Sequence, residues 1–381
     1  MEGDHIIIWQ WLKPLSWLYG LVITLRNILF DCGILRSESF DVPVISVGNL
    51  TAGGTGKTPH TEYLIRLFGR QFQVAVLSRG YKRKSHGFKL AEANTPMRDI
   101  GDEPYQMKEK YPFVRVAVDK KRTRGIKHLC SSELKPETDV VILDDAFQHR
   151  YVIPGVNILL MDYHRLIYYD QLLPAGRLRE PRSSSQRADI VIVTKCPTYI
   201  TPMEKRGIAR SLEMQPWQKL YFTTFRYGNL QPVHMPGQET EQDEMELSQL
   251  REAKVNILLL TGIASPQQME YDLKKYCEFT AIHYADHHNF TKKDLAKVEA
   301  MARQLSQNGK PTIIVTTEKD AARLSTSRHH IDSATFHIYK LPIEVQFLDG
   351  QDEDFNQTIL GYVKKNSRNS ILLKGKNKHT T

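Results

Sequence analysis

The stretch VPVISVGNLTAGGTGKTP, residues 42–59, decides the fold that we predict for this chain. It reads as a buried strand over 42–48, then a glycine-rich loop, then a helix from about 58 to 69. Backbone N–H groups of such a loop surround phosphate oxygens, and the positive end of the following helix points at the same anion. Lys57 would reach the terminal phosphates of a nucleotide, and the Thr58 hydroxyl would bind Mg²⁺.

The loop departs from the general pattern GxxxxGK[ST] at its first position, where Thr51 replaces glycine. Gly53 and Gly54 still supply a flexible backbone, and GKT between a strand and a helix disfavours the alternative of a plain glycine turn. We therefore expect the whole loop to bind the nucleotide, through Thr51, Ala52, Gly53, Gly54, Thr55, Gly56, Lys57 and Thr58.

Short runs rich in valine and isoleucine follow this loop and alternate with helical stretches. These runs are 73–78, 113–118, 139–144, 156–161 and 189–194. The alternation predicts an α/β fold of the P-loop NTPase class, with a mostly parallel sheet flanked by helices over residues 37–225.

A polar, acidic stretch with proline and glycine at 226–254 reads as a linker. Beyond it, strand-like runs at 256–261, 279–284, 311–316 and 335–341 alternate with helices at about 266–276 and 291–307. They predict a second, smaller α/β domain over 255–350. The remainder, 351–381, should hold a helix over 353–365 that packs on either domain, followed by a basic, disordered tail.

The N-terminal segment 1–36 is apolar and rich in tryptophan, but charges interrupt it. Its longest stretch without a charge, Pro14 to Leu25, has 12 residues, whereas a membrane span needs about 20. Two interpretations remain, a buried core helix and an interfacial helix. We favour the interfacial helix, because a cluster of tryptophan and tyrosine suits the headgroup region: Trp9, Trp11, Trp17 and Tyr19.

Composition restricts the partners. The chain has 381 residues and a net charge of +9, which implies anionic partners such as nucleic acid, an acidic membrane or phosphorylated substrates. It has no long basic arm of the kind that binds nucleic acid, so we expect no nucleic-acid partner. Its four cysteines lack the spacing of a zinc site or a disulfide framework. We expect a monomer.

Two acidic pairs are candidates for the chemistry. Asp144 and Asp145 end the apolar run of DVVILDDAFQH, where a P-loop protein needs a carboxylate for its metal. Asp102 and Glu103 precede Pro104, so they either cap a helix or supply the general base that takes a proton from an attacking hydroxyl.

Two further segments have both a functional and a plain interpretation. In YADHHNF, residues 284–290, His287 either lies on the surface or orients Asp102, because adjacent histidines alone do not make a metal site. The arginines of 172–189 either meet phosphates or form a solvated loop. VTKCP at 193–197 lacks the aspartate of a guanine-reading motif, which counts against a switch GTPase.

Together these motifs resemble the tetraacyldisaccharide 4′-kinase family. The resemblance covers about 45–320 and rests on segments that occur in the family's order: SVGNLTAGGTGKTP, LSRGYKR, GDEP, LDDAFQHR, LLPAGRLREP, ADHHNF and TEKDAAR. Thr51 matches the family's variant of the loop, whereas Ala146 departs from the glycine that many members carry after the aspartate pair.

The resemblance implies a magnesium-dependent transferase that moves the γ-phosphate of ATP to the 4′-hydroxyl of a lipid A disaccharide precursor. It implies a peripheral or monotopic protein on the cytoplasmic face of the inner membrane, in contact with its lipids. By similarity, Asp102 is the base and His287 assists it. Asp144, with Thr58, serves Mg²⁺, and Asp145 serves transition-state geometry. The remaining cleft residues would be Glu103, Gln148, Arg179 and Glu180. The alternative is a P-loop switch GTPase or a metallochaperone.

Overall fold

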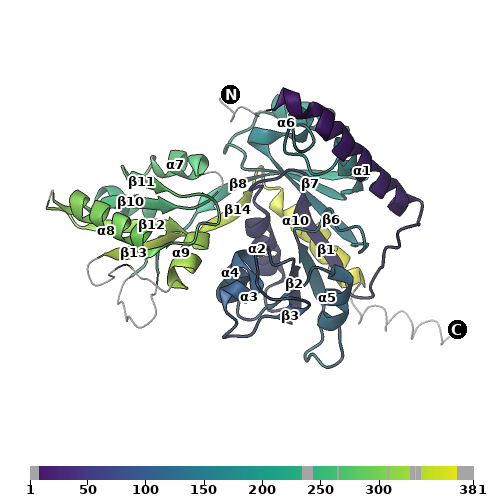
Figure 1. Cartoon of the computed structure of the whole chain (residues 1–381), viewed down its shortest axis with the longest axis horizontal. Coiled ribbons are helices and arrows are strands. Elements are labelled where there is room, and N and C mark those ends of the chain that lie inside the picture. The colour runs from purple at the N-terminus through teal and green to yellow at the C-terminus, as the bar shows by residue number, and fades with distance from the viewer. Residues whose placement is uncertain are drawn as a thin grey trace. The chain divides into compact units, whose positions relative to one another are not determined.

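The computed structural model describes residues 8–233, 243–263, 266–307, 309–326, 331 and 336–366. The chain divides into two units (Figure 1), one formed by 1–225 with 345–381 and one formed by 226–344. Each unit has its own sheet.

The first unit is built on a nine-stranded sheet in the order β14-β8-β7-β6-β1-β5-β2-β4-β3. Its strands from β1 to β7 match the apolar runs that the sequence predicts, apart from the short β3. The bounds are β1 Val44–Asn49, β2 Val74–Ser78, β3 Lys89–Leu90, β4 Arg115–Val118, β5 Val140–Asp144, β6 Val156–Asp162, β7 Ile190–Thr194, β8 Lys219–Tyr227 and β14 Ile343–Phe347.

Parallel pairing brings the site segments together. β1 lies between β5 and β6, β5 pairs with β2, and all of these pairs are parallel. The carboxyl ends of neighbouring parallel strands lie at one edge of a sheet, which is where α/β proteins bind ligands. The segments after β1, β5 and β2, which are the glycine-rich loop, the aspartate pair and the SRGY motif, therefore meet at that edge.

Helices cover both faces of this sheet. The helices of the first unit are α1 Lys13–Asp31, α2 Lys57–Phe68, α3 Met97–Ile100, α4 Asp102–Lys110, α5 Arg122–Leu129, α6 Pro202–Ser211 and α10 Asp352–Asn366. One core cluster joins the sheet to α2, α4 and α10, while two others contain residues of α6 and of α5. The predicted fold class is confirmed.

The second unit has a five-stranded sheet in the order β11-β10-β12-β13-β9, in which only β9 is antiparallel to its neighbour. Its strands are β9 Gln231–Pro232, β10 Asn256–Thr261, β11 Thr280–His283, β12 Thr312–Thr317 and β13 His337–Leu341. Its helices are α7 Gln267–Leu273, α8 Lys292–Ser306 and α9 Glu318–Ser325. Apolar side chains on the two faces of this sheet form separate core clusters.

The sequence-based boundaries differ from this division at two places. Within 226–254, the expected linker, β9 joins the second sheet, and Leu230, Leu247 and Leu250 are buried in its core. Near the other boundary, β14 and α10 return to the first unit, where Phe355 and Ile359 are fully buried. Polarity around the buried leucines concealed the first contact, and the short β14 gave no distinct signal. The expected tail lies almost entirely outside the described residues.

The N-terminal helix α1 has an inverted pattern of exposure. Ser16 and Gly20 face the unit together with Phe30 near the end of the helix, whereas most of the large apolar side chains face away from it. The exposed apolar side chains of α1 and of the residues just before it are Trp9, Trp11, Leu15, Trp17, Leu18, Leu21, Val22, Leu25 and Ile28, and the exposed fraction reaches 75% at Trp17. Figure 1 shows α1 on the outside of the first unit. A helix in this segment is confirmed, whereas its placement in a membrane interface stays a prediction. No helix among the described residues is long and apolar enough to cross a bilayer.

Candidate active site

A buried asparagine forms hydrogen bonds with two residues of the glycine-rich loop. Asn49, the last residue of β1, donates through Nδ2 to the carbonyl of Thr51 and to Oγ1 of Thr55, each at 2.8 Å. Gly53 and Gly56 have positive φ angles of 123° and 82°, which glycine adopts without the strain that a Cβ would bring. The turn at Gly56 starts α2, so Lys57 and Thr58 occupy its first turn, as expected for a phosphate-binding loop.

A buried histidine forms a hydrogen bond with the same turn. His60 Nδ1 lies 2.8 Å from the carbonyl of Gly56, so this nitrogen carries a proton and donates. Nε2 then accepts from the hydroxyl of Thr223 at 3.1 Å. Burial lowers the pKa of His60 to about 4, so the ring is neutral at pH 7.

The basic segment LLPAGRLREP runs beside the loop. Ala52 donates to the carbonyl of Arg177 and Arg179 donates to that of Leu50, both at 2.7 Å. Thr51 and Leu178 form an antiparallel bridge between these two bonds. The segment therefore pairs with residues 50–52 as a short strand would and fixes their backbone. The arginines of the segment did not suggest this role.

Asp145 links the loop to this segment. Its carboxylate lies 3.6 Å from Lys57 Nζ and 3.3 Å from an Arg179 nitrogen. Its φ angle of 49° is unusual for a residue other than glycine, and such outliers concentrate at functional sites. Burial raises the pKa of Asp145, but Lys57, Arg179 and Arg122 outweigh it and the pKa falls below its ordinary value.

Asp144 differs from its neighbour in its environment and in the direction in which its pKa is shifted. It is buried, Ser78 donates to its Oδ2 at 3.1 Å, and its Oδ1 has no hydrogen-bond partner among the described residues. Burial and the nearby Asp145 raise the pKa of Asp144 to about 6. A buried carboxylate oxygen without a donor suits a divalent cation, whose charge would reverse this shift.

Arg122 supports the aspartate pair and was missed in the sequence. Its guanidinium is fully buried and donates to the carbonyl of Asp144 at 3.0 Å and to that of Asp119 at 2.6 Å. Burial lowers the pKa of Arg122 to about 10. The residue belongs to no motif recognised in the sequence, so only the three-dimensional structure reveals its role.

Asp102 and Glu103 occupy the first turn of α4, after Gly101. Glu103 lies close enough to contribute to the raised pKa of Asp144. Gly101 and Gly80 interlock the GDEP and SRGY segments, because a Cβ on Gly101 would stand 2.9 Å from the carbonyl of Tyr81. The start of α4 therefore lies at the same edge of the sheet as the aspartate pair.

The other predicted cleft residues form the wall between this site and α1. Gln148 donates to the carbonyl of Asn49 at 2.7 Å and accepts at its own carbonyl from Arg26 at 2.9 Å. Glu180 is buried and pairs with Arg26 and Arg187. Tyr19 donates to the carbonyl of Arg179 at 2.8 Å. Gln148 and Glu180 thus support the site through hydrogen bonds and ion pairs within the chain.

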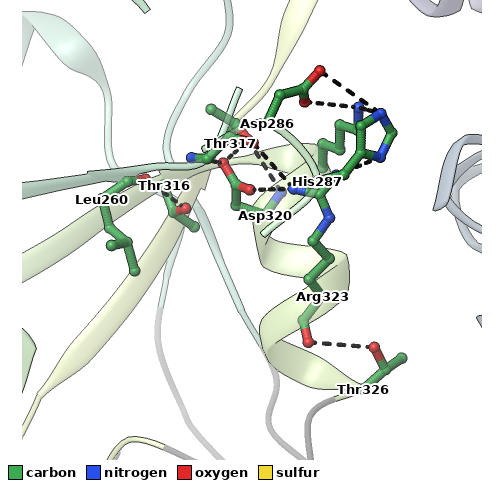
Figure 2. Close-up of polar contacts among 10 residues, drawn as sticks. Leu260, Asp286, His287, Thr316, Thr317, Asp320, Arg323 and Thr326 are labelled. Atoms are coloured by element: carbon green, nitrogen blue, oxygen red, sulfur yellow. Dashed lines mark hydrogen bonds and ion pairs between the residues drawn. The ribbon is translucent and has the colours of Figure 1, made fainter. Parts of the chain in front are cut away.

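His287 belongs to the second unit, whereas Asp102 belongs to the first. Figure 2 shows His287 and Asp286 beside Asp320 and Arg323 of α9. The next residue, His288, instead forms a hydrogen bond with Asp294 at 2.9 Å and stacks on Tyr284, which gives His288 a structural role. Among the described residues, no cluster of three or more histidine, cysteine, aspartate or glutamate side chains could hold a metal ion, so the two histidines do not form a metal site of that kind. The pairing of His287 with Asp102 stays a prediction.

Comparison with known proteins identifies the family to which this arrangement belongs. Residues 8–364 match the family model described as tetraacyldisaccharide-1-P 4′-kinase, LpxK. The chain belongs to the tetraacyldisaccharide 4′-kinase family. Relatives in this family named tetraacyldisaccharide 4′-kinase include one from Phocaeicola vulgatus, 53% identical over 97% of this chain and 99% of the relative. Another, from Bacteroides thetaiotaomicron, is 51% identical over the full length of both chains.

A solved structure extends this family assignment to the fold. LpxK from Aquifex aeolicus, whose crystal structure is described as an "apo" form in complex with ATP, superposes with a TM-score of 0.67 at 30% identity. The match covers 92% of this chain and 98% of that one. The family predicted from the sequence motifs is confirmed. The alternative of a switch GTPase or a metallochaperone is not favoured.

Proposed function

We propose that this chain transfers the γ-phosphate of ATP to the 4′-hydroxyl of a tetraacyldisaccharide 1-phosphate, a step of lipid A biosynthesis. The observation that carries the proposal is a phosphate-binding loop, with Lys57 against Asp145, in a chain that matches the kinase family from residue 8 to 364. Phosphoryl transfer requires placement and neutralised charge rather than covalent chemistry from the protein.

The loop amides and Lys57 would bind the terminal phosphates of ATP, and Thr58 with Asp144 would hold Mg²⁺. The orphaned Oδ1 of Asp144 fits such a cation. When bound, Mg²⁺ would neutralise phosphate charge. Asp145 already pairs with Lys57 and Arg179. The carboxylate of Asp145 would therefore keep both of these side chains oriented toward the phosphates.

Asp102 is the residue that we propose to accept the proton of the attacking hydroxyl. The proximity of Glu103, its neighbour, to Asp144 supports the assignment. A carboxylate is a weak base for a sugar hydroxyl, so a histidine that shares the proton would assist it, and His287 is our candidate.

A transfer assay tests the reaction. Purified full-length protein is mixed with labelled ATP and a tetraacyl diglucosamine 1-phosphate in micelles, and label in the lipid is measured. Asp102→Ala should lower kcat by about 100-fold or more and leave the Kd for ATP unchanged. Glu109→Ala, at the exposed end of the same helix, is the matched control. An unchanged kcat in Asp102→Ala would remove Asp102 from the mechanism. Failure to label any lipid, or equal turnover of GTP without an acceptor, would overturn the proposed function.

We also propose that α1 lies in the membrane interface on the cytoplasmic face of the inner membrane. Most of its large apolar side chains face away from the unit while Ser16 and Gly20 face inward, the reverse of what packing in water alone would select. Fully burying one leucine contributes about 1.5–3 kcal/mol, so several side chains would anchor the protein. Anchoring would bring the enzyme to an acceptor whose acyl chains hold it in the bilayer.

A further inference from the structure

The TEKDAAR motif, residues 317–323, forms the start of α9 and has no place in the reaction as proposed so far. Thr317 caps the helix by accepting from the Asp320 backbone N–H at 3.1 Å. Asp320 is fully buried, and its carboxylate accepts from Gly262 N at 2.8 Å and from Arg323 at 2.9 Å. Arg323 also donates to the carbonyl of Gly262 at 3.1 Å. The motif therefore ties α9 to the loop that follows β10.

The same helix reaches His287. Arg323 lies 3.2 Å from Nδ1 of the imidazole, and Lys319 lies 3.1 Å from Nε2 (Figure 2 shows the ring beside α9). Lys319 also pairs with Asp286 at 3.4 Å. Arginine and lysine only donate, while a neutral imidazole has one acceptor nitrogen. Arg323 therefore favours the tautomer whose acceptor is Nδ1, and Lys319 favours the tautomer whose acceptor is Nε2. In either tautomer the two cations restrict the position of the ring.

The backbone of His287 also requires support. Its φ angle of 61° is unusual for a residue other than glycine, and a conformation of this kind persists only where the surroundings enforce it. The loops after β10, β11 and β12 meet at this point, because those strands are parallel neighbours. Side chains of the TEKDAAR motif contact two of these loops, at Gly262 and at His287.

We propose that Lys319 and Arg323 are positioning residues that hold the imidazole of His287 in its working orientation. The inference rests on the proposed function, in which His287 assists Asp102. The buried pair of Asp320 and Arg323 also stabilises the second unit by itself. Lys319 distinguishes the two roles, because its side chain is 20% exposed and its contacts include Asp286 and His287.

The test is a double-mutant cycle in the full-length protein. Lys319→Met should lower kcat by about 10- to 100-fold, the effect of a small misplacement at a reacting group, with KM for ATP unchanged. Lys319→Arg should restore part of the rate. In a His287→Ala background, Lys319→Met should have no further effect. Lys274→Met, at an exposed lysine of the same unit, is the control. Ring ¹⁵N shifts of labelled His287 should move in Lys319→Met and not in the control.

The outcomes separate the two levels of the proposal. If Lys319→Met lowers kcat equally with and without His287, or leaves both kcat and the ring shifts unchanged, the positioning role is refuted. If His287→Ala itself retains full kcat while the ring shifts still respond to Lys319, the helix positions the ring, but the assistance of His287 to Asp102 is wrong. Loss of all lipid transfer in the wild type would refute the proposed function instead.

Discussion

Acidification should weaken the first unit through His60, the ring under the phosphate-binding loop. The folded protein holds this imidazole neutral between the carbonyl of Gly56 and the hydroxyl of Thr223. Burial lowers its pKa from 6.5 to about 4. The unfolded chain binds a proton at this position below pH 6.5, while the folded chain does not until about pH 4. The contribution of His60 to stability is therefore complete above pH 6.5 and is lost as the pH falls toward 4.

The size of the effect follows from the two pKa values. From 6.5 to about 4 is a fall of about 2.5 pH units, and each is equivalent to about 1.4 kcal/mol. The free energy of unfolding should thus drop by up to about 3.5 kcal/mol because of His60 alone as the pH falls from 6.5 toward 4. This is a large part of the 5–15 kcal/mol, roughly, that stabilises an ordinary domain.

Urea unfolding of the wild type and His60→Gln, followed between pH 4.5 and 8, measures this contribution. The difference in unfolding free energy between the two proteins should be constant above pH 7. Below pH 6.5 it should shift against the wild type by about 1.4 kcal/mol per pH unit. His149, whose pKa burial also lowers to about 4, is present in both proteins and cancels. His86→Gln, at an exposed histidine, controls for the loss of one ring from the unfolded chain. A difference that does not change with pH would refute the reasoning.

Two other contacts give predictions of different kinds. Glu62 is buried and joins α2 to α4 through Lys110 at 2.7 Å and Gln106 at 3.0 Å. Glu62→Ala should lower the free energy of unfolding by about 3 kcal/mol, the lower end for breaking a buried pair, and a loss below about 1 kcal/mol in urea would contradict this. In α1, Leu18→Asp with Leu25→Asp should abolish flotation with anionic vesicles and leave the circular dichroism spectrum unchanged. The control is Tyr271→Asp, at an exposed residue of the second unit, and retained flotation would contradict the interfacial placement.

The sequence predicts most of the first unit, because the strands that carry its site are fully buried. β1, β2, β5, β6 and β7 are mostly apolar in the sequence and are buried along nearly their whole length. Because β1 and β5 are parallel neighbours, the end of β5 at Asp144 must lie beside the loop that follows β1. The phosphate-binding loop and the aspartate pair follow from this geometry.

The residues that support the site could not be found in the same way. Arg122 acts by donating to the backbone carbonyl of Asp144, and Asn49 by donating to Thr51 and Thr55. Both roles depend on side-chain direction across a loop, which no periodic pattern encodes. Glu180 shows a second limit of the sequence. Its motif predicts a cleft residue, and that role stays a prediction, while the structure shows the carboxylate buried against Arg26 and Arg187. A charge in a motif does not reveal whether its partner is a ligand or another side chain.

The contacts of α1 connect the proposed membrane surface to the proposed nucleotide site. Arg26 of this helix donates to Gln148, Gln148 donates to Asn49, and Asn49 donates to Thr55 of the loop. A surface anchor alone would need only a flexible tether, because any tether confines the enzyme to the bilayer. A hydrogen-bonded path through one packed unit fixes the height of the loop relative to the exposed face of α1. If that face lies in the interface, the terminal phosphate of ATP is held at a set depth, and the acceptor hydroxyl must come to it from the headgroup layer. Orientation of this kind lowers the barrier by restricting the reacting groups before they meet.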